Sequence, residues 1–135
     1  MFGKILMLDL YKCKKGVCDD LELHYRFLEE LVERLGMQKL CQPVCLHAPV
    51  RFENGKRIEI YPDKTGVSAW IGLITSGIQV HSCEESGFCS IDVYTCGELD
   101  VEKVVEFCKE IFQTEDLDSS MMNRGIRYCV PQTGN

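Results

Sequence analysis

Apolar and polar positions alternate with two different periods along the chain, and each period predicts one kind of element. Residues 4–11 (KILMLDLY) are predicted to form a first strand with at least one buried face. Residues 21–35 carry apolar side chains every three or four positions, which is typical of a helix that packs against a sheet. We expect Asp19 or Asp20 to cap this helix and Gly36 to end it. Its buried stripe is predicted to be Leu21, Tyr25, Leu28, Val32 and Leu35.

The rest of the chain continues this alternation of strands and helices. The pattern predicts an edge strand at 38–48, a hairpin over 51–61 that turns at Asn54-Gly55, and strands at about 67–75, 77–82 and 88–96. A second helix is predicted from a cap at Asp100 to about Gln113. Its buried stripe is predicted to be Val101, Val104, Val105, Cys108, Ile111 and Phe112. Residues 114–120 are expected to form an acidic loop, and residues 121–130 a last strand.

This order of elements predicts an α+β fold, a two-layer α/β sandwich in which two helices cover one face of a mostly antiparallel sheet. The length predicts a single domain over residues 1–135. The second face of such a sheet would be apolar and exposed in a monomer. We therefore expect a two-fold homodimer that buries it.

Composition narrows the possible partners and the compartment. A formal net charge of −6 argues against nucleic acid, because binding phosphates needs a basic face. No apolar run reaches the roughly 20 residues of a membrane span, and we interpret the N-terminus as a strand rather than a signal peptide. The nine cysteines lack a C-x-x-C pair, which favours buried thiols in a reducing cytoplasm. No metal site is expected, and the less favoured alternative is a site formed by Cys13/Cys18 or by Cys41/Cys45 with His47.

The chemistry concentrates between residues 66 and 97, GVSAWIGLITSGIQVHSCEESGFCSIDVYTCG. A serine that attacks the preceding peptide carbonyl forms an ester, and elimination then leaves a pyruvoyl group, an electron sink for decarboxylation. Ser76 has the glycine neighbour Gly77, which tolerates an unusual backbone. His81 is the candidate base, because an imidazole is the side chain that most often serves as a base at physiological pH. Strict alternation would put Ser76 and His81 on opposite faces of one strand, so this hypothesis requires a turn or bulge at Ser76-Gly77.

Spacing in this segment resembles that of the bacterial and archaeal S-adenosylmethionine decarboxylase family. The matching residues are GVS at 66–68, Ser76, His81 and DVYTCG at 92–97. The family pattern is E-S-H-x-x-x-H-T-W-P-E followed by D-x-F-T-C-G. The resemblance implies a pyruvoyl cofactor made from Ser76 by cleavage after Thr75, and a homodimer with sites near the protomer interface.

The same resemblance implies a role for each matched position. Ser68 and His81 match the pair that assists cleavage, and Cys96 matches the cysteine that protonates the product carbanion. Glu85 matches the acid that ends the family motif and is a candidate substrate-binding residue. Phe52 or Tyr61 is a candidate for the aromatic residue that stacks on the substrate's adenine. These assignments make S-adenosylmethionine the first expected substrate, in a pathway that leads to spermidine.

Departures from the family pattern leave other hypotheses open. Thr75 replaces the glutamate, Gly77 the histidine, and Cys83-Glu84 the Trp-Pro pair. The chain is therefore also consistent with a pyruvoyl decarboxylase of arginine or ornithine, or with an unprocessed binding or regulatory paralogue. Taken one by one, Ser76 fits an ordinary turn serine, His81 a structural histidine and Cys96 a buried thiol.

Overall fold

A computed structural model describes residues 1–47, 50–59 and 66–130. Its helices are α1 (Leu21–Arg34) and α2 (Val101–Phe112), and a short 3₁₀ turn spans Val17–Asp19. Its strands are β1 (Gly3–Tyr11), β2 (Val44–His47), β3 (Val50–Glu53), β4 (Lys56–Glu59), β5 (Gly66–Gly72), β6 (Ser76–Cys83), β7 (Phe88–Thr95) and β8 (Asp116–Arg124). No helix in the described part of the chain is long and apolar enough to cross a membrane.

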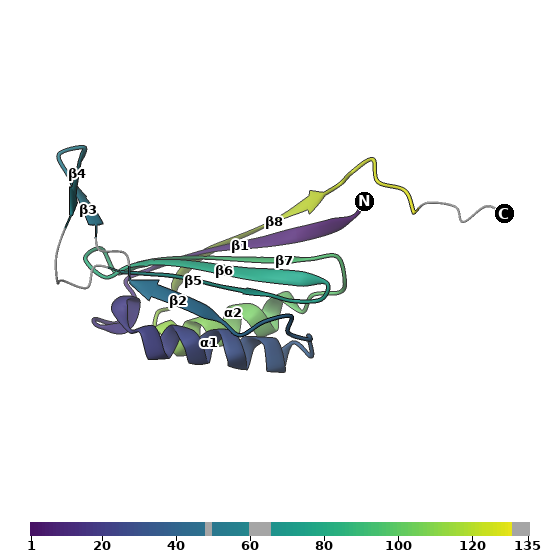
Figure 1. Cartoon of the computed structure of the whole chain (residues 1–135), viewed down its shortest axis with the longest axis horizontal. Coiled ribbons are helices and arrows are strands. Elements are labelled where there is room, and N and C mark those ends of the chain that lie inside the picture. The colour runs from purple at the N-terminus through teal and green to yellow at the C-terminus, as the bar shows by residue number, and fades with distance from the viewer. Residues whose placement is uncertain (48–49, 60–65, 131–135) are drawn as a thin grey trace.

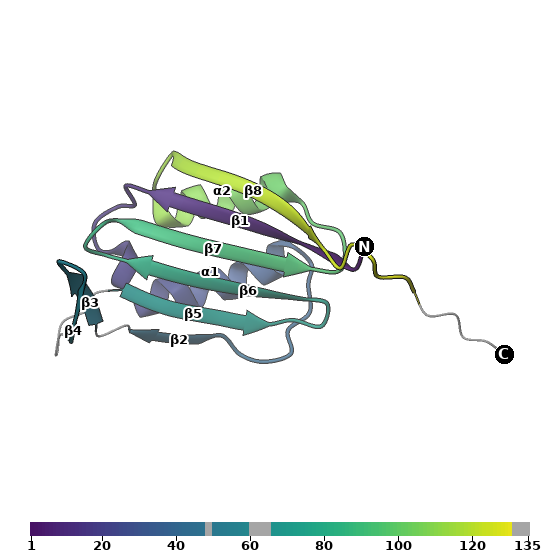
Figure 2. The ribbon, with the colours of Figure 1, turned by 90° about the horizontal axis from the view of Figure 1, so that it is seen from above.

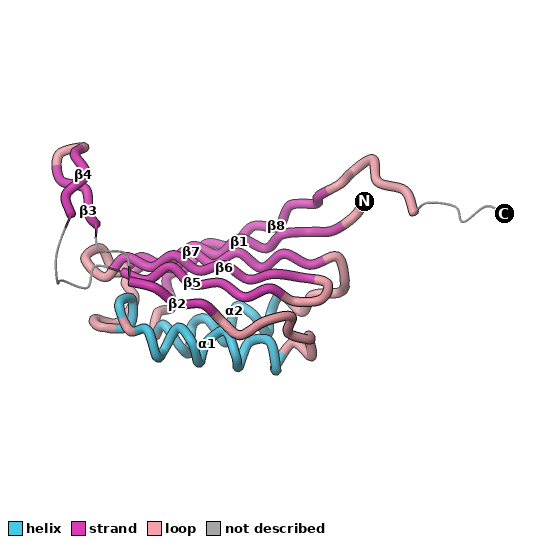
Figure 3. Tube along the Cα trace, viewed as in Figure 1, coloured by secondary structure: helices cyan, strands magenta, loops and turns pink. Residues whose placement is uncertain are grey.

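Six strands form one antiparallel sheet in the order β2-β5-β6-β7-β1-β8. Figure 2 looks onto this sheet and shows the strands side by side. Both helices lie on the same side of it, as Figures 1 and 3 show. The predicted α+β sandwich is therefore confirmed.

Helix α1 begins where its sequence predicts, but it buries a different stripe. The Asp20 side chain accepts a hydrogen bond from the backbone N–H of Leu23 at 3.0 Å. Its buried residues are His24, Phe27, Leu28, Leu31 and Val32, and Tyr25 is 37% exposed. The predicted stripe was thus rotated, because it excluded the polar His24 and overlooked Phe27. In the core, Phe27 stacks on Phe107 of α2, with ring centroids 5.6 Å apart.

The C-terminal strand was placed too late in the chain by the sequence pattern. Residues 116–120, predicted as an acidic loop, form the first half of β8. This strand pairs with β1 from Tyr11↔Asp116 to Gly3↔Arg124. Thr114 fixes the entry to the strand by donating its hydroxyl to the Tyr11 carbonyl oxygen. An edge strand has only one neighbour and solvated side chains, so its polar residues gave no strand signal.

The segment before β5 matches the prediction in part. Only Val44–His47 of the predicted strand 38–48 forms β2, and Lys39 makes one isolated bridge to Leu73. Strands β3 and β4 form the predicted hairpin, with Asn54 and Gly55 at φ 50° and 75°. Figure 1 shows this hairpin standing apart from the six-stranded sheet. Tyr61 and the side chain of Phe52 lie outside the described residues.

The two faces of the sheet differ in chemistry. The face toward the helices buries Leu6, Leu8, Leu10, Val67, Ala69, Ile71, Ile78, Val80, Cys89, Ile91 and Val93. The opposite face, called the open face here, is covered by no described element (Figure 1). Strand pairing places on it Ile5, Met7, Asp9, Ser68, Trp70, Gln79, His81, Ser90, Asp92 and Tyr94. The expectation of an apolar face was therefore too simple, because aromatic residues there alternate with a histidine and carboxylates.

Candidate active site

Ser76 is the first residue of β6, directly after the turn that joins β5 to β6. The backbone N–H of Leu73 donates to the Ser76 carbonyl oxygen at 2.9 Å and closes this turn. From Ser76 onward, β6 pairs with β7 without interruption, beginning at Ser76↔Thr95. The predicted distortion at Ser76-Gly77 is therefore wrong, because the turn lies just before Ser76. Gly77 also has no positive φ, so its backbone does not require a glycine.

The peptide bond between Thr75 and Ser76 is held by Cys96. The Thr75 carbonyl oxygen accepts hydrogen bonds from the Cys96 backbone N–H at 3.0 Å and from Cys96 Sγ at 3.3 Å. Ser76 Oγ donates to Thr95 Oγ1 at 2.7 Å and lies 3.1 Å from Thr75 Oγ1. A hydroxyl is thus fixed next to a carbonyl that two donors polarise, which favours acyl transfer at this bond.

A second polar group lies on the open face. Ser68 Oγ and His81 Nδ1 are 2.9 Å apart, and Gln79 Nε2 is 2.9 Å from His81 Nε2. Ser68 and His81 are cross-strand partners on β5 and β6, so the two residues to which the resemblance gives a joint role in cleavage lie in contact. Because an amide NH₂ donates, we assign the neutral imidazole with its proton on Nδ1, donated to Ser68.

Within one chain, His81 does not meet Ser76. The two residues are five positions apart on the regular strand β6, which corresponds to about 16 Å. An odd separation also directs their side chains to opposite faces, with Ser76 toward the buried Thr95 and His81 toward the open face. The prediction that His81 reaches its own Ser76 is therefore wrong, since the expected bulge is absent.

Glu85 lies in the turn between β6 and β7, at the end of β6 far from Ser76. Its neighbour Glu84 has a structural contact that the sequence did not indicate. The Glu84 carboxylate accepts the backbone N–H groups of Gly16 at 2.7 Å and of Cys18 at 3.1 Å. Glu84 is therefore an anchor for the loop after β1 rather than part of a solvated acidic turn.

Thr95 and Gln79 are site residues that sequence reasoning missed. Thr95 is fully buried and also accepts the backbone N–H of Gly97 at 3.0 Å, which fixes the backbone around Cys96. The register Ser76↔Thr95 was the signal that could have identified it. Gln79 could have been found from its place two residues before His81, on the same face of a strand.

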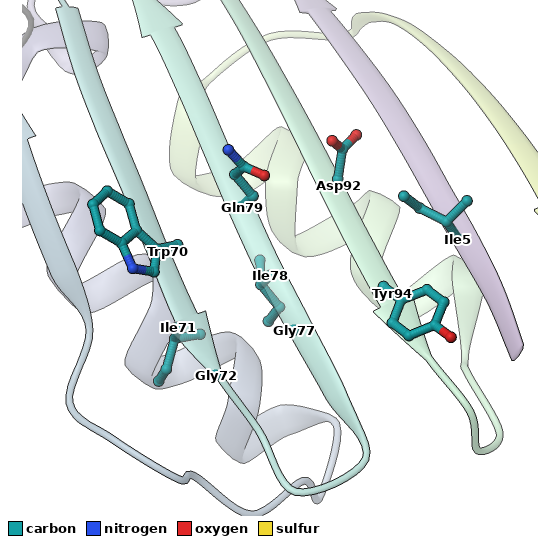
Figure 4. Close-up of a pocket in the computed structure, with 9 residues that line it drawn as sticks. All are labelled: Ile5, Trp70, Ile71, Gly72, Gly77, Ile78, Gln79, Asp92 and Tyr94. Atoms are coloured by element: carbon teal, nitrogen blue, oxygen red, sulfur yellow. The ribbon is translucent and has the colours of Figure 1, made fainter.

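A cavity of about 480 Å³ lies on the open face beside Ser76. Figure 4 shows the residues that line it: Ile5, Trp70, Ile71, Gly72, Gly77, Ile78, Gln79, Asp92 and Tyr94. Burial raises the pKa of the Asp92 carboxyl, His81 lowers it, and Asp9 raises it. The volume of this cavity is in the range of small-molecule sites.

The cysteines differ in exposure, and Cys45 and Cys83 are intermediate. Cys13, Cys18, Cys89 and Cys108 are buried, and Cys96 is exposed. Burial raises the pKa of Cys89 to about 12, so this thiol stays protonated and packs as a small apolar side chain. Across the described residues, no three histidine, cysteine or acidic side chains gather in a way that could hold a metal ion.

Comparisons with known proteins identify the family of the chain. The family model described as S-adenosylmethionine decarboxylase matches residues 4–125. The S-adenosylmethionine decarboxylase proenzyme of Pyrococcus horikoshii is 42% identical over 62 residues, which are 45% of this chain and 45% of that protein. The match therefore spans about half the length of this relative. The proenzyme of Caldicellulosiruptor saccharolyticus is 24% identical over 125 residues, which are 92% of this chain and 89% of that protein.

One solved structure extends the likeness to the whole fold. The crystal structure of the adenosylmethionine decarboxylase from Aquifex aeolicus has a TM-score of 0.73 and 21% sequence identity, and the alignment covers 99% of this chain and 97% of the other. At this identity the comparison supports the fold alone. The family match, by contrast, extends over most of the sequence, including every residue of the site around Ser76. The chain therefore belongs to the S-adenosylmethionine decarboxylase family.

Proposed function

We propose that this chain is a pyruvoyl-dependent decarboxylase that cleaves itself between Thr75 and Ser76 and acts on S-adenosylmethionine. The observation that carries the proposal is the pair of hydrogen bonds from Cys96 to the Thr75 carbonyl oxygen. An ordinary turn serine does not need a polarised carbonyl on the residue before it. The relatives named as proenzymes support the same reading, since a proenzyme must be processed.

Self-cleavage begins with attack of Ser76 Oγ on the carbonyl carbon of Thr75. The C–O bond forms as the peptide C–N bond breaks, which leaves an ester and a free amine on residue 76. Cys96 N–H and S–H stabilise the oxyanion of the tetrahedral intermediate. A base then removes the α-hydrogen of Ser76, the Cβ–O bond breaks, and the Thr75 carboxylate leaves. The resulting dehydroalanine tautomerises to an imine, and water replaces its nitrogen as ammonia.

The residues present fit the group formed in this way, because residue 76 is at a strand start beside a cavity. When formed, the pyruvoyl carbonyl supplies the electron sink for loss of carbon dioxide. Cys96 has an exposed thiol beside this position, so it is placed to donate a proton to the product. Thr95 fixes Cys96 through the Gly97 N–H and is a positioning residue.

The base for elimination comes from a second copy of the chain. On a strand the Cα–H bond of Ser76 lies near the plane of the sheet, so a base can approach it from the open face, opposite the face that the Ser76 side chain occupies. His81 and Ser68 lie on that face but about 16 Å along β6 from their own Ser76. A two-fold dimer with its open faces together brings His81 of one protomer toward Ser76 of the other. The mixed aromatic and polar character of the face suits such an interface.

An unprocessed binding paralogue is the second candidate. Thr75 and Gly77 replace the two family residues that flank the serine, and Thr75 Oγ1 lies 3.1 Å from Ser76 Oγ. Because the Ser76 hydroxyl donates its one proton to Thr95, Thr75 donates to Ser76 Oγ and occupies a lone pair that attack on the carbonyl carbon would use. In this case the cavity still binds a ligand, but the peptide bond stays intact.

The denatured mass of the purified protein decides between the two candidates. The proposed enzyme gives two fragments, one ending at Thr75 and one beginning with a blocked residue 76. Ser76→Ala serves as the control and must remain a single chain. A wild-type protein that stays intact for days at neutral pH would refute self-cleavage and leave the binding paralogue.

A further inference from the structure

Two glycines lie in the cavity on the open face, and neither backbone conformation nor steric crowding requires a glycine at these positions. Gly72 and Gly77 are cross-strand partners on β5 and β6, and neither has a positive φ. A Cβ added at Gly77 would meet only the Ile71 carbonyl oxygen, at 3.7 Å, and one at Gly72 would meet only Cys41 Sγ, at 3.7 Å. Larger side chains are therefore compatible with the backbone here. What the glycines provide is an empty floor for the cavity.

The side chains around this floor are those that recognise a cation. Trp70 stands on β5 next to Gly72, and Tyr94 stands on β7 directly opposite Gly77. Figure 4 shows Trp70, Gln79 and Asp92 in a row across three neighbouring strands. Aromatic rings attract cations through their electron-rich faces, and a carboxylate adds a full opposite charge.

The Asp92 carboxylate is available for a ligand. Its oxygens have no hydrogen bond or ion pair with another residue in the described part of the chain. Its environment is partly desolvated, which strengthens the attraction of a bound cation relative to the same pair in water. Among the described residues, His81 is the basic group near enough to lower the pKa of Asp92, and it makes no hydrogen bond to this carboxylate. A partly buried acid two residues from Tyr94 on β7, without a directly paired cation, is unusual for a purely structural sheet.

We propose that this cavity binds the positively charged portion of the substrate, with Asp92 as its counter-ion and Trp70 and Tyr94 as its aromatic walls. The inference rests on the proposed function, which attaches the other end of the substrate covalently to residue 76. Gly77 follows residue 76 directly, so a substrate held at residue 76 extends over the glycine floor. The Gln79 and Asp92 row lies three residues further along the strand, about 10 Å from residue 76.

Sulfonium amino acids and basic amino acids both have a positive charge in addition to the α-ammonium group. The sulfonium of S-adenosylmethionine is close to its α-carbon and would lie above Gly77, beside Tyr94. The guanidinium of arginine is at the end of a longer side chain and extends toward Asp92. Ornithine has an ammonium group at an intermediate distance. All three ligands have a positive charge that the cavity can bind. They differ in whether Tyr94 or Asp92 contributes most to their affinity.

Direct binding tests the inference without depending on cleavage. Trp70 is the only tryptophan of the chain, so its fluorescence reports on this cavity. We would titrate the uncleaved Ser76→Ala protein with two matched pairs: S-adenosylmethionine against S-adenosylhomocysteine, which lacks the sulfonium charge, and arginine against citrulline, which lacks the guanidinium charge. In each pair the ligands differ at the position of the charge. At least one cation is expected to bind about tenfold more tightly than its neutral partner.

Variants assign the effect to named residues. Asp92→Asn is expected to weaken the preferred cation about tenfold, and Gly77→Leu to abolish its binding by filling the floor. Asp9→Asn is the matched control, because it removes the same charge from the same face but does not line the cavity. It is expected to change affinity by no more than about twofold. S-adenosylmethionine and arginine are distinguished by which of them loses more affinity in Asp92→Asn.

Two outcomes would overturn the inference. One is equal binding of the neutral and charged member of both pairs. The other is an Asp92→Asn variant that binds the cation no more weakly than Asp9→Asn does. The proposed function fails separately, through an intact wild-type mass. A protein that stays uncleaved but binds a cation through Asp92 would thus refute self-cleavage and retain the cavity.

Discussion

Mixing two inactive variants tests whether cleavage uses residues from two copies. His81→Ala keeps Ser76 but lacks the proposed base, and Ser76→Ala keeps the base but has nothing to cleave. Each variant alone is expected to stay uncleaved or to stop at the ester. In the proposed two-fold arrangement, Ser76 of the first chain faces His81 of the second, so a mixed dimer has one complete combination. We therefore expect the mixture to cleave the His81→Ala chain.

The size of the effect follows from the geometry and the symmetry. Ser76 and His81 of one chain are about 16 Å apart along β6 and on opposite faces, so rescue within one chain is excluded. In an equimolar mixture of randomly paired two-fold dimers, each His81→Ala chain has an even chance of an unlike partner. About half of the His81→Ala chains should then be cleaved, and none of the Ser76→Ala chains.

The assay uses denatured mass, with different affinity tags so that the fragments of each variant are distinguishable. The variants are co-expressed, so that the dimers form from a mixed pool. The control replaces Ser76→Ala with the double variant Ser76→Ala/His81→Ala, which pairs equally well but has no histidine to offer. Normal cleavage of His81→Ala alone would remove His81 from the role of base. Mixed dimers without cleavage would refute the arrangement between two copies.

Three further changes probe the same region and the core. Cys96→Ala keeps its backbone N–H but loses the S–H donor to Thr75, so cleavage followed by mass should slow about tenfold; an unchanged rate would remove the Cys96 thiol from the role of oxyanion donor. Thr95→Val leaves the N–H of Gly97 without an acceptor and should lower the free energy of unfolding by about 1–3 kcal/mol in urea, whereas an exposed Thr75→Val control should not. Burial lowers the pKa of His24 in the fold, so the unfolded chain binds the extra proton first, and stability should fall as pH drops below about 6.5, by at most about 1.4 kcal/mol per pH unit. Urea unfolding of the uncleaved protein should show a smaller decline in His24→Gln, and equal slopes would contradict this assignment.

The sequence predicted most of the helices and strands correctly because the residues that begin and end them interact with near neighbours in the chain. The Asp20 and Asp100 caps each lie one residue before a helix, where the side chain binds a free backbone N–H three residues later. The Asn54-Gly55 turn likewise depends on two positive φ values within the turn itself. Each of these features, the two helix caps and the hairpin turn, depends on residues that are close in sequence. A single sequence is therefore enough to predict them.

The errors came from contacts between distant segments. Strand β8 was missed in its first half because its hydrogen bonds come from β1, more than a hundred residues away. His24 was left out of the core because its polar ring is satisfied by Asp20 in the same helix and by Ser82 on β6, at 2.7 and 2.6 Å. Helical periodicity alone treats such a histidine as a surface residue.

In the candidate site too, the sequence predicted the residues of the motif but not those that depend on contacts between strands. The family spacing identified Ser76, Ser68, His81 and Cys96, and the structure brings them together as two pairs: Ser68 with His81, and Cys96 with the bond before Ser76. Thr95 was not identified, because its role depends on the register between β6 and β7. Register is decided by the turn and by the buried face, and neither is visible in the spacing of a motif.

The odd spacing between Ser76 and His81 is the most informative feature of the motif. On a regular strand, five residues separate the side chains by face as well as by distance, so one chain cannot use both at one bond. A bulge would have removed this conflict, but the register from Ser76↔Thr95 to Cys83↔Phe88 is continuous. A two-fold axis removes it without distortion, because an exposed histidine on one open face then meets the strand end of another. The same axis would close the cavity beside Trp70 and Asp92, so that cleavage, ligand binding and dimer formation depend on one surface.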